Sequence, residues 1–121
     1  MRIATWAFIA ALAVPSTALA QSDALPPTGL AQYQSGGVTS IPVGGTATST
    51  TVVLSAYVSG TNPAANYRLR VELRPTSSAF TGVFTHEAAT NVAYPGGTST
   101  VTISGLAPGQ TYHWQARTYA T

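Results

Sequence analysis

The clearest pattern in the chain is the alternation of apolar and polar side chains at residues 67–75, YRLRVELRP. Every second side chain from Tyr67 onward is apolar, whereas the side chains between them are Arg or Glu. Because successive side chains of a strand point to opposite faces, this pattern predicts a strand with one buried face and one solvated face. Pro75 lacks a backbone N–H, so we expect the strand pairing to end there.

Weaker forms of the same period predict strands at residues 30–34, 50–59, 99–105 and 111–119. Pro26 and Pro27 cannot donate to a strand ladder, so the first strand should pair only beyond them. The segments VGGTATSTTVVL and PGGTSTVTI share a turn followed by a Thr-rich strand, which favours their pairing in one sheet. Six or seven short strands joined by turns indicate an all-β fold, an antiparallel β-sandwich.

The N-terminus has the features of an export signal. Arg2 supplies a positive charge, residues 3–14 are apolar, and Ala18, Leu19 and Ala20 form a small-residue cleavage site. The apolar run is too short to cross a hydrocarbon core, which needs about 20 residues. We therefore expect a signal peptide at residues 1–20 that is cleaved after Ala20, no membrane span after cleavage, and a secreted, periplasmic or cell-surface location.

The composition excludes several kinds of bond and ligand for the mature chain. There is no Cys in the 121 residues, which excludes disulfides and thiolate ligands. Removal of the signal would leave about 100 residues, the size of an immunoglobulin-like sandwich. Four Arg would then stand against three acidic residues, a net charge of +1. Such a small charge offers no footprint for nucleic acid.

The segment GLAPGQTYHWQA carries a resemblance to a known fold. Together with YRLRVELRPTSSAFTG and STVTISGLAPGQTYHWQART, it resembles the fibronectin type III domains of large exported bacterial repeat proteins, over roughly residues 30–119. The resemblance implies that Leu106, Pro108 and Tyr112 form the corner between the fifth and sixth strands, with the Tyr ring turned inward and its hydroxyl bonded to the backbone. Trp114 shares the face of Tyr112, so we predict it in the core rather than stacked on a sugar.

On this resemblance the chain consists of a signal peptide at 1–20, a polar Pro-rich leader at 21–29 and a fibronectin type III-like domain at 30–121. The family has a seventh strand after the Tyr-bearing one, so we expect this domain to be C-terminally incomplete. Either the chain is a fragment of a longer protein or a partner donates the strand, and residues 111–119 form an unpaired edge that can pair with another chain. The loop SGTNPAANY lacks the Asp residues of calcium-binding repeats, and no metal is expected.

Pairing of the third and sixth strands, which the resemblance implies, brings polar side chains to one outer face. We take the following residues as a candidate ligand surface: Arg68, Arg70, Arg74, His113 and Arg117. In one interpretation the guanidinium groups of the four arginines bind carboxylates of acidic glycans or of a protein partner. In the other, these side chains form a solvated face on which Glu72 balances their charge.

Catalytic signals are weak. His86 and Glu87 adjoin, but neighbours in a strand point to opposite faces, which favours a solvated loop over half of a metal or acid–base site. We expect no catalytic, cofactor-binding or metal-binding residues. The sequence favours a non-catalytic exported module that serves as a spacer or adhesion domain, with other domains, proteins or extracellular glycans as partners. The alternative is a carbohydrate-binding accessory domain of an exported hydrolase.

Overall fold

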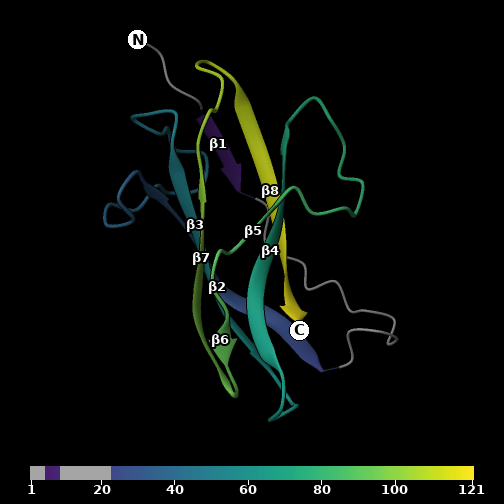
Figure 1. Cartoon of the computed structure of the whole chain (residues 1–121). Helices are drawn as coiled ribbons and strands as arrows, with labels where there is room; N and C mark the ends of the chain where they lie inside the picture. Colours follow the sequence, from purple (N-terminus) through teal and green to yellow (C-terminus); the bar gives the residue numbers. More distant parts are fainter. Residues whose placement is uncertain (1–4, 9–22) are drawn as a thin grey trace.

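The computed structural model describes residues 5–8 and 23–121 of the chain, which contain eight strands and no helix (Figure 1). The strands are β1 (Thr5–Phe8), β2 (Ala24–Gln34), β3 (Val52–Gly60), β4 (Asn66–Pro75), β5 (His86–Glu87), β6 (Val92–Ala93), β7 (Gly96–Ile103) and β8 (Thr111–Ala120). Within these residues no helix has the length and apolarity needed to cross a bilayer.

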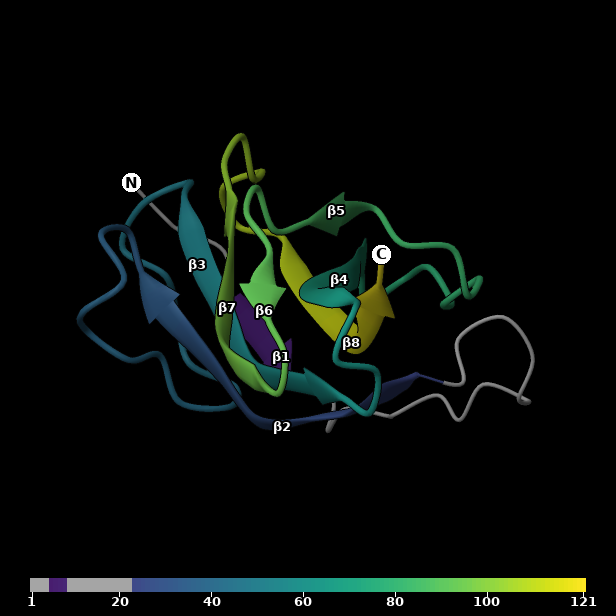
Figure 2. The same ribbon diagram turned by 60° about the horizontal axis from the view of Figure 1, so that its bottom comes forward.

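The strands form two sheets. In the first, which we call sheet A, the strand order is β1-β8-β4-β5, and β6 also pairs with β4. In the second, sheet B, the order is β2-β3-β7. Every ladder is antiparallel except that of β1 with β8. Figure 2 shows β2, β3 and β7 as one layer and β4 and β8 as the other. The predicted all-β antiparallel sandwich is confirmed.

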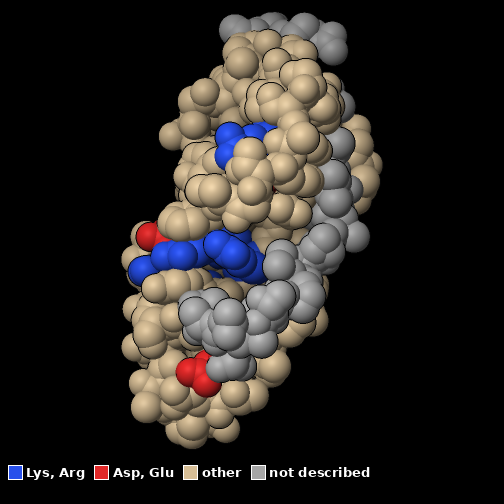
Figure 3. Space-filling view, turned by 90° about the vertical axis from the view of Figure 1, so that its right-hand side faces the viewer, with Lys and Arg blue, Asp and Glu red and all other residues tan. Residues whose placement is uncertain are grey.

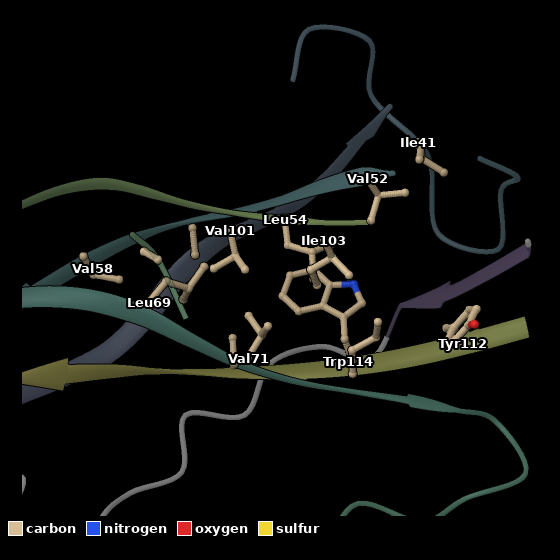
Figure 4. Close-up of a cluster of buried hydrophobic side chains, with 14 of the residues drawn as sticks. Ile41, Val52, Leu54, Val58, Leu69, Val71, Val101, Ile103, Tyr112 and Trp114 are labelled. Atoms are coloured by element: carbon tan, nitrogen blue, oxygen red, sulfur yellow. The ribbon is translucent and has the colours of Figure 1, made fainter. Parts of the chain in front are cut away.

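The alternating pattern of β4 and β8 determines which face of sheet A is buried. The inward side chains at positions 67, 69, 71 and 73 of β4 and 112, 114, 116 and 118 of β8 are all buried. Trp114 is fully buried, and Figure 4 shows its indole ring between β8 and the side chains of Leu54 and Ile103 from sheet B. Burial of such a side chain stabilises the fold by about 1.5–3 kcal/mol, so this layer holds the two sheets together.

β2 begins earlier than the sequence predicts. The expectation that pairing starts only beyond Pro26 and Pro27 is wrong, because Ala24 already lies opposite Gly60 in the ladder with β3. The register shifts between Leu25 and Thr28, and again between Thr28 and Ala31. Proline cannot donate a ladder hydrogen bond and is tolerated in a strand at such irregularities. The register shifts thus explain why β2 can contain both prolines. Residues 24–29, expected in a leader, are therefore part of sheet B.

The two segments that begin with Gly-Gly-Thr lead into neighbouring strands. β3 pairs with β7 from Val52 opposite Ile103 to Ser59 opposite Gly96, which confirms their predicted pairing. Gly96 adopts φ +151°, and a Cβ at this position would collide with the carbonyl oxygen of Val58. The absence of a side chain at Gly96 thus lets β7 approach β3 closely at this end.

Two tyrosines close turns of the chain with their hydroxyl groups. The Tyr112 hydroxyl accepts a hydrogen bond from the Ala107 N–H at 2.9 Å, at the corner that the fibronectin resemblance implied. The Tyr67 hydroxyl accepts from the Asn62 N–H at 2.9 Å and donates to the Asn62 carbonyl at 3.0 Å. In the first corner Leu106 is buried and Pro108 is exposed. Each hydroxyl satisfies backbone groups that leave the ladder at a turn.

The outer side of β8 is paired along its first four residues. β1 runs parallel to residues 111–114, from Thr5 opposite Thr111 to Phe8 opposite Trp114. The unpaired edge expected for residues 111–119 is therefore wrong over residues 111–114. β1 belongs to the segment expected as a signal peptide, whereas the other residues of that segment and the cleavage position after Ala20 lie outside the described part of the chain.

Candidate functional site

The outward side chains of β4 and β8 form a charged surface across sheet A. Arg70 lies opposite Arg117, and Arg68 lies opposite Tyr119. Cross-strand neighbours have Cβ atoms about 5 Å apart, so these side chains share one surface. Figure 3 shows basic side chains as a band across the middle of this side of the molecule, with a second, separate basic group above it. We define the arginine face as Arg68, Arg70, Phe84, Glu87, Arg117 and Tyr119.

Arg70 is held in place on three sides. The centre of its guanidinium group lies 3.4 Å from the ring centroid of Tyr119 and 4.0 Å from that of Phe84. Its Nε donates a hydrogen bond to Oε1 of Glu87 at 3.0 Å. Stacking on aromatic rings and a charged hydrogen bond both restrict the side chain, so little rotamer entropy remains to be lost on binding. The terminal nitrogens of Arg70 have no hydrogen-bond partner among the described residues.

Positive charge exceeds negative charge on the arginine face. Oε1 of Glu87 lies 3.3 Å from Nε of Arg68 and 3.0 Å from Nε of Arg70, so one carboxylate serves two arginines. Arg117 forms no ion pair within the described residues. These side chains are partly exposed, from 16% for Arg70 to 34% for Glu87. The face therefore presents an uncompensated guanidinium to solvent.

A shallow hollow of about 70 Å³ opens beside Arg70 and Arg117. Its other walls include Phe84, Gln115 and the carboxylate-bearing Glu72. A water molecule takes up about 30 Å³ in the liquid, so the hollow has room for a group of the size of a carboxylate. A planar guanidinium can donate two parallel hydrogen bonds to such a group.

Arg74 and His113 lie on the same sheet face as the three other candidate ligand residues, but the loop of residues 76–85 engages them. Nε of Arg74 donates to Glu72 at 2.8 Å, and a terminal nitrogen donates to the Thr81 hydroxyl at 3.0 Å. Nε2 of His113 lies 2.8 Å from the Ser78 carbonyl oxygen, and its ring stacks on Phe80 at 4.0 Å. The five predicted residues thus separate into three on the arginine face and two that hold this loop.

Glu72 is a structural anchor that sequence reasoning treated as a surface counter-charge. Its side chain is only 3% exposed and accepts five hydrogen bonds. The donors are Nε of Arg74, the backbone N–H and hydroxyl of Thr81, the Gly82 N–H and Nε2 of Gln115. Burial by itself raises the pKa of Glu72, but these hydrogen bonds outweigh burial and lower the pKa from 4.5 to about 2. The ionised carboxylate thus fixes residues 76–85 on sheet A.

Phe84 and Tyr119 complete the arginine face and were not among the candidate residues. Tyr119 continues the alternation of Arg117 on β8, so the period of the strand already placed it on the outer face. Phe84 lies outside the strands, and its position depends on how residues 76–85 fold over β4. No periodic signal in the sequence places this ring.

Trp114 lies in the core, and the neighbouring residues His86 and Glu87 form the short strand β5. Trp114 is fully buried and donates through Nε1 to Gln32 at 2.9 Å, so its ring is inaccessible to a sugar. His86 and Glu87 lie on β5, where His86 contacts the Thr85 hydroxyl and Glu87 faces the arginines. Burial lowers the pKa of His86. Within the described chain no three or more His, Asp or Glu side chains gather as metal ligands would.

Comparisons with protein-family models, with curated proteins and with solved structures found no match to this chain.

Proposed function

We propose that the chain is a non-catalytic, exported interaction module with a fibronectin type III-like fold, serving as a spacer or adhesion domain of a bacterial surface or secreted protein. The arginine face is its contact surface, and carboxylate groups of a protein partner or an acidic glycan are its ligands. The Tyr112 corner and the ladder of β4 with β8 support the fibronectin type III-like assignment. The proposed location rests on the sequence pattern at residues 1–20, which is typical of an export signal.

The observation that carries this proposal is the restrained guanidinium of Arg70. Two rings and Glu87 orient it, while its terminal nitrogens remain without protein partners among the described residues. A donor that is already oriented loses little entropy on binding, which favours affinity. Arg117 stands beside it across the ladder and adds a second cation to the hollow. Together they present a paired-donor surface to carboxylates.

Calorimetric titration with poly-L-glutamate and with polygalacturonate tests this function. Arg117→Gln should weaken binding about tenfold or more, because a charge-assisted hydrogen bond contributes roughly 1.5–3 kcal/mol. Arg70→Lys retains the charge but loses the planar fork, and it should also weaken binding. Raising the salt concentration should lower the affinity of the wild type.

Val38→Glu is the control for net charge, because it lowers the charge by one at a highly exposed position outside sheet A. If affinity depends on net charge alone, Val38→Glu and Arg117→Gln will weaken binding equally, and the assignment to the arginine face fails. Absence of binding to both polyanions by the folded wild type also contradicts the proposal. Circular dichroism of each variant checks that the sheets remain folded.

A further inference from the structure

Charge is distributed unequally between the two sheets. β2, β3 and β7 contain no Asp, Glu, Lys or Arg, and neither do the connections at residues 35–51 and 104–110. Among residues 23–121 the only charged residue outside β4, β5 and β8 is Asp23, just before β2. The outer face of sheet B is therefore neutral, in contrast to the arginine face on sheet A.

Hydroxyl groups cover the neutral face in ordered rows. The antiparallel ladders place Thr102 opposite Val53, Thr100 opposite Ser55 and Thr98 opposite Tyr57. The threonines of β7 occur at every second position, and all three are exposed. Of their partners on β3 only Tyr57 is exposed, so the exposed hydroxyls of this surface are those of the three threonines and Tyr57, and cross-strand neighbours among them lie about 5 Å apart.

A hollow of about 620 Å³ lies on this face beside residues 35–37. Gly37 has a left-handed backbone at φ +75°, and a Cβ added there would lie 3.8 Å from the Val53 side chain, so this turn borders the hollow. The lining is made only of uncharged residues: Tyr33, Ser35, Gly36, Gly37, Thr51, Val53, Ser55, Thr98, Thr100 and Thr102. Pockets for small ligands have volumes of about 300–1,000 Å³, so the hollow has a suitable size.

Five side-chain hydroxyls of this surface are available to bind a ligand. The side-chain hydroxyls of Tyr33, Tyr57, Thr98, Thr100 and Thr102 form no hydrogen bond within residues 23–121. Tyr57 is 45% exposed and neighbours Thr98, which lines the hollow. A Tyr ring offers an apolar surface on which the C–H face of a sugar can pack, and its hydroxyl can donate or accept.

From this arrangement we infer a second binding site, for a neutral extended oligosaccharide, on the outer face of sheet B. A sugar chain presents many hydroxyls, each able to donate and accept, and the Thr and Tyr hydroxyls match both roles. Without a charged group, the surface incurs no penalty for removing an ion from water. Tyr57 and Val53 are four residues apart on β3, about 14 Å at strand rise, which gives the site room for several linked sugar units.

This site is independent of the proposed function, because it uses the other sheet and ligands without charge. Cellohexaose, a flat chain, and maltohexaose, a curved one, are the probes, and we expect the sheet surface to favour cellohexaose. Isothermal titration gives the affinity, and two-dimensional amide NMR locates the contact. Binding should shift resonances of β3 and β7 and leave those of β4 and β8 unchanged.

Two variants test the residues that carry this inference. Tyr57→Ala should weaken cellohexaose binding about tenfold, since it removes the stacking ring. Thr100→Val replaces a hydroxyl by a methyl group of the same shape and should weaken binding severalfold without disturbing the strand. Arg117→Gln is the control on the opposite sheet and should leave the affinity for cellohexaose unchanged.

The inference is overturned if neither hexasaccharide binds the folded wild type. It is also overturned if the double variant Tyr57→Ala, Thr100→Val retains wild-type affinity, or if the NMR shifts lie on sheet A. Polygalacturonate separates this inference from the proposed function. Loss of its binding in Arg117→Gln, with retained binding in Tyr57→Ala, assigns the anionic ligand to the arginine face alone.

Discussion

The indole Nε1 of Trp114 donates a hydrogen bond to Oε1 of Gln32 at 2.9 Å in the interior of the sandwich. Both side chains are buried, with Trp114 on β8 of sheet A and Gln32 on β2 of sheet B. Gln32 in turn donates through Nε2 to the Pro42 carbonyl at 3.1 Å. The polar tip of the largest core side chain is thus satisfied by the facing sheet, and this bond fixes the position of one sheet relative to the other.

Gln32→Leu should lower the free energy of unfolding by about 1–3 kcal/mol, because it leaves the Trp114 N–H buried without its acceptor. Urea unfolding monitored by far-ultraviolet circular dichroism measures the change, because this signal does not depend on Trp114. A double-mutant cycle with Trp114→Phe should give a coupling energy of about 0.5–3 kcal/mol. Purely additive effects of the two substitutions would show that the hydrogen bond contributes nothing to stability.

The buried Glu72 should make stability depend on pH in acid. Its pKa is lowered to about 2 in the folded chain from 4.5, so the ionised form is favoured by folding. The stabilisation is fully present above pH 4.5 and is lost as the pH falls toward 2. The shift corresponds to roughly 3 kcal/mol, by the usual relation between pKa shifts and stability. Urea unfolding at several pH values from 2 to 7 measures this loss.

Glu72→Gln should remove most of that acid dependence and lower stability at neutral pH. Hydrogen exchange at Thr81 and Gly82 should accelerate, because their amides donate to the carboxylate. Glu87→Gln is the matched control, since Glu87 is partly exposed and receives no backbone N–H. Equal acid sensitivity in wild type and Glu72→Gln would contradict the assignment.

The two turn-closing tyrosines allow a direct comparison. Tyr67→Phe removes both an acceptor and a donor for the Asn62 backbone, whereas Tyr112→Phe removes the acceptor for the Ala107 N–H. Each variant should lose about 1–3 kcal/mol of unfolding free energy. Amide exchange should accelerate at Asn62 in the first variant and at Ala107 in the second. Unchanged exchange at these two amides would show that the hydroxyls do not hold the turns.

Alternation within one strand was enough to predict β4 and β8 of sheet A, because the side-chain period and the burial of one face are local consequences of an extended backbone. It did not predict β1, β5 and β6, which are short and have no such period. The prediction of β2 failed at Pro26 and Pro27, since a shift of register lets the strand continue past prolines, and such a shift depends on the pairing with β3. The arginine face was predicted only in part. Phe84 reaches the arginine face because Glu72 holds the loop of residues 76–85 on sheet A. A hydrogen bond from a loop amide to a buried carboxylate on a strand leaves no periodic pattern in the sequence.

Thr118 is expected to be a site where substitution stabilises the fold. Its hydroxyl is buried and has no hydrogen-bond partner among the described residues. Thr118→Val has nearly the same shape and removes a polar group that folding takes out of water. The free energy of unfolding should therefore rise by about 1 kcal/mol or more. A fall in thermal stability would indicate that a water or another group satisfies this hydroxyl.

The pairing of β1 with β8 predicts that removal of residues 1–20 alters one edge of sheet A. In the full chain the backbone at residues 112–114 lies between β1 and β4, and Thr111 pairs with β1. A chain that begins at Gln21 lacks β1, so amides in this stretch that are protected by β1 should exchange faster. Amides of residues 115–119 lie beyond the pairing with β1 and serve as the internal comparison.

The full chain, expressed without export, and the shortened chain are compared by hydrogen exchange and by size-exclusion chromatography. Because an open strand edge is a template for pairing, the shortened chain should also self-associate more at high concentration. Equal exchange at residues 111–114 and equal elution of both chains would mean that β1 does not protect this edge in solution.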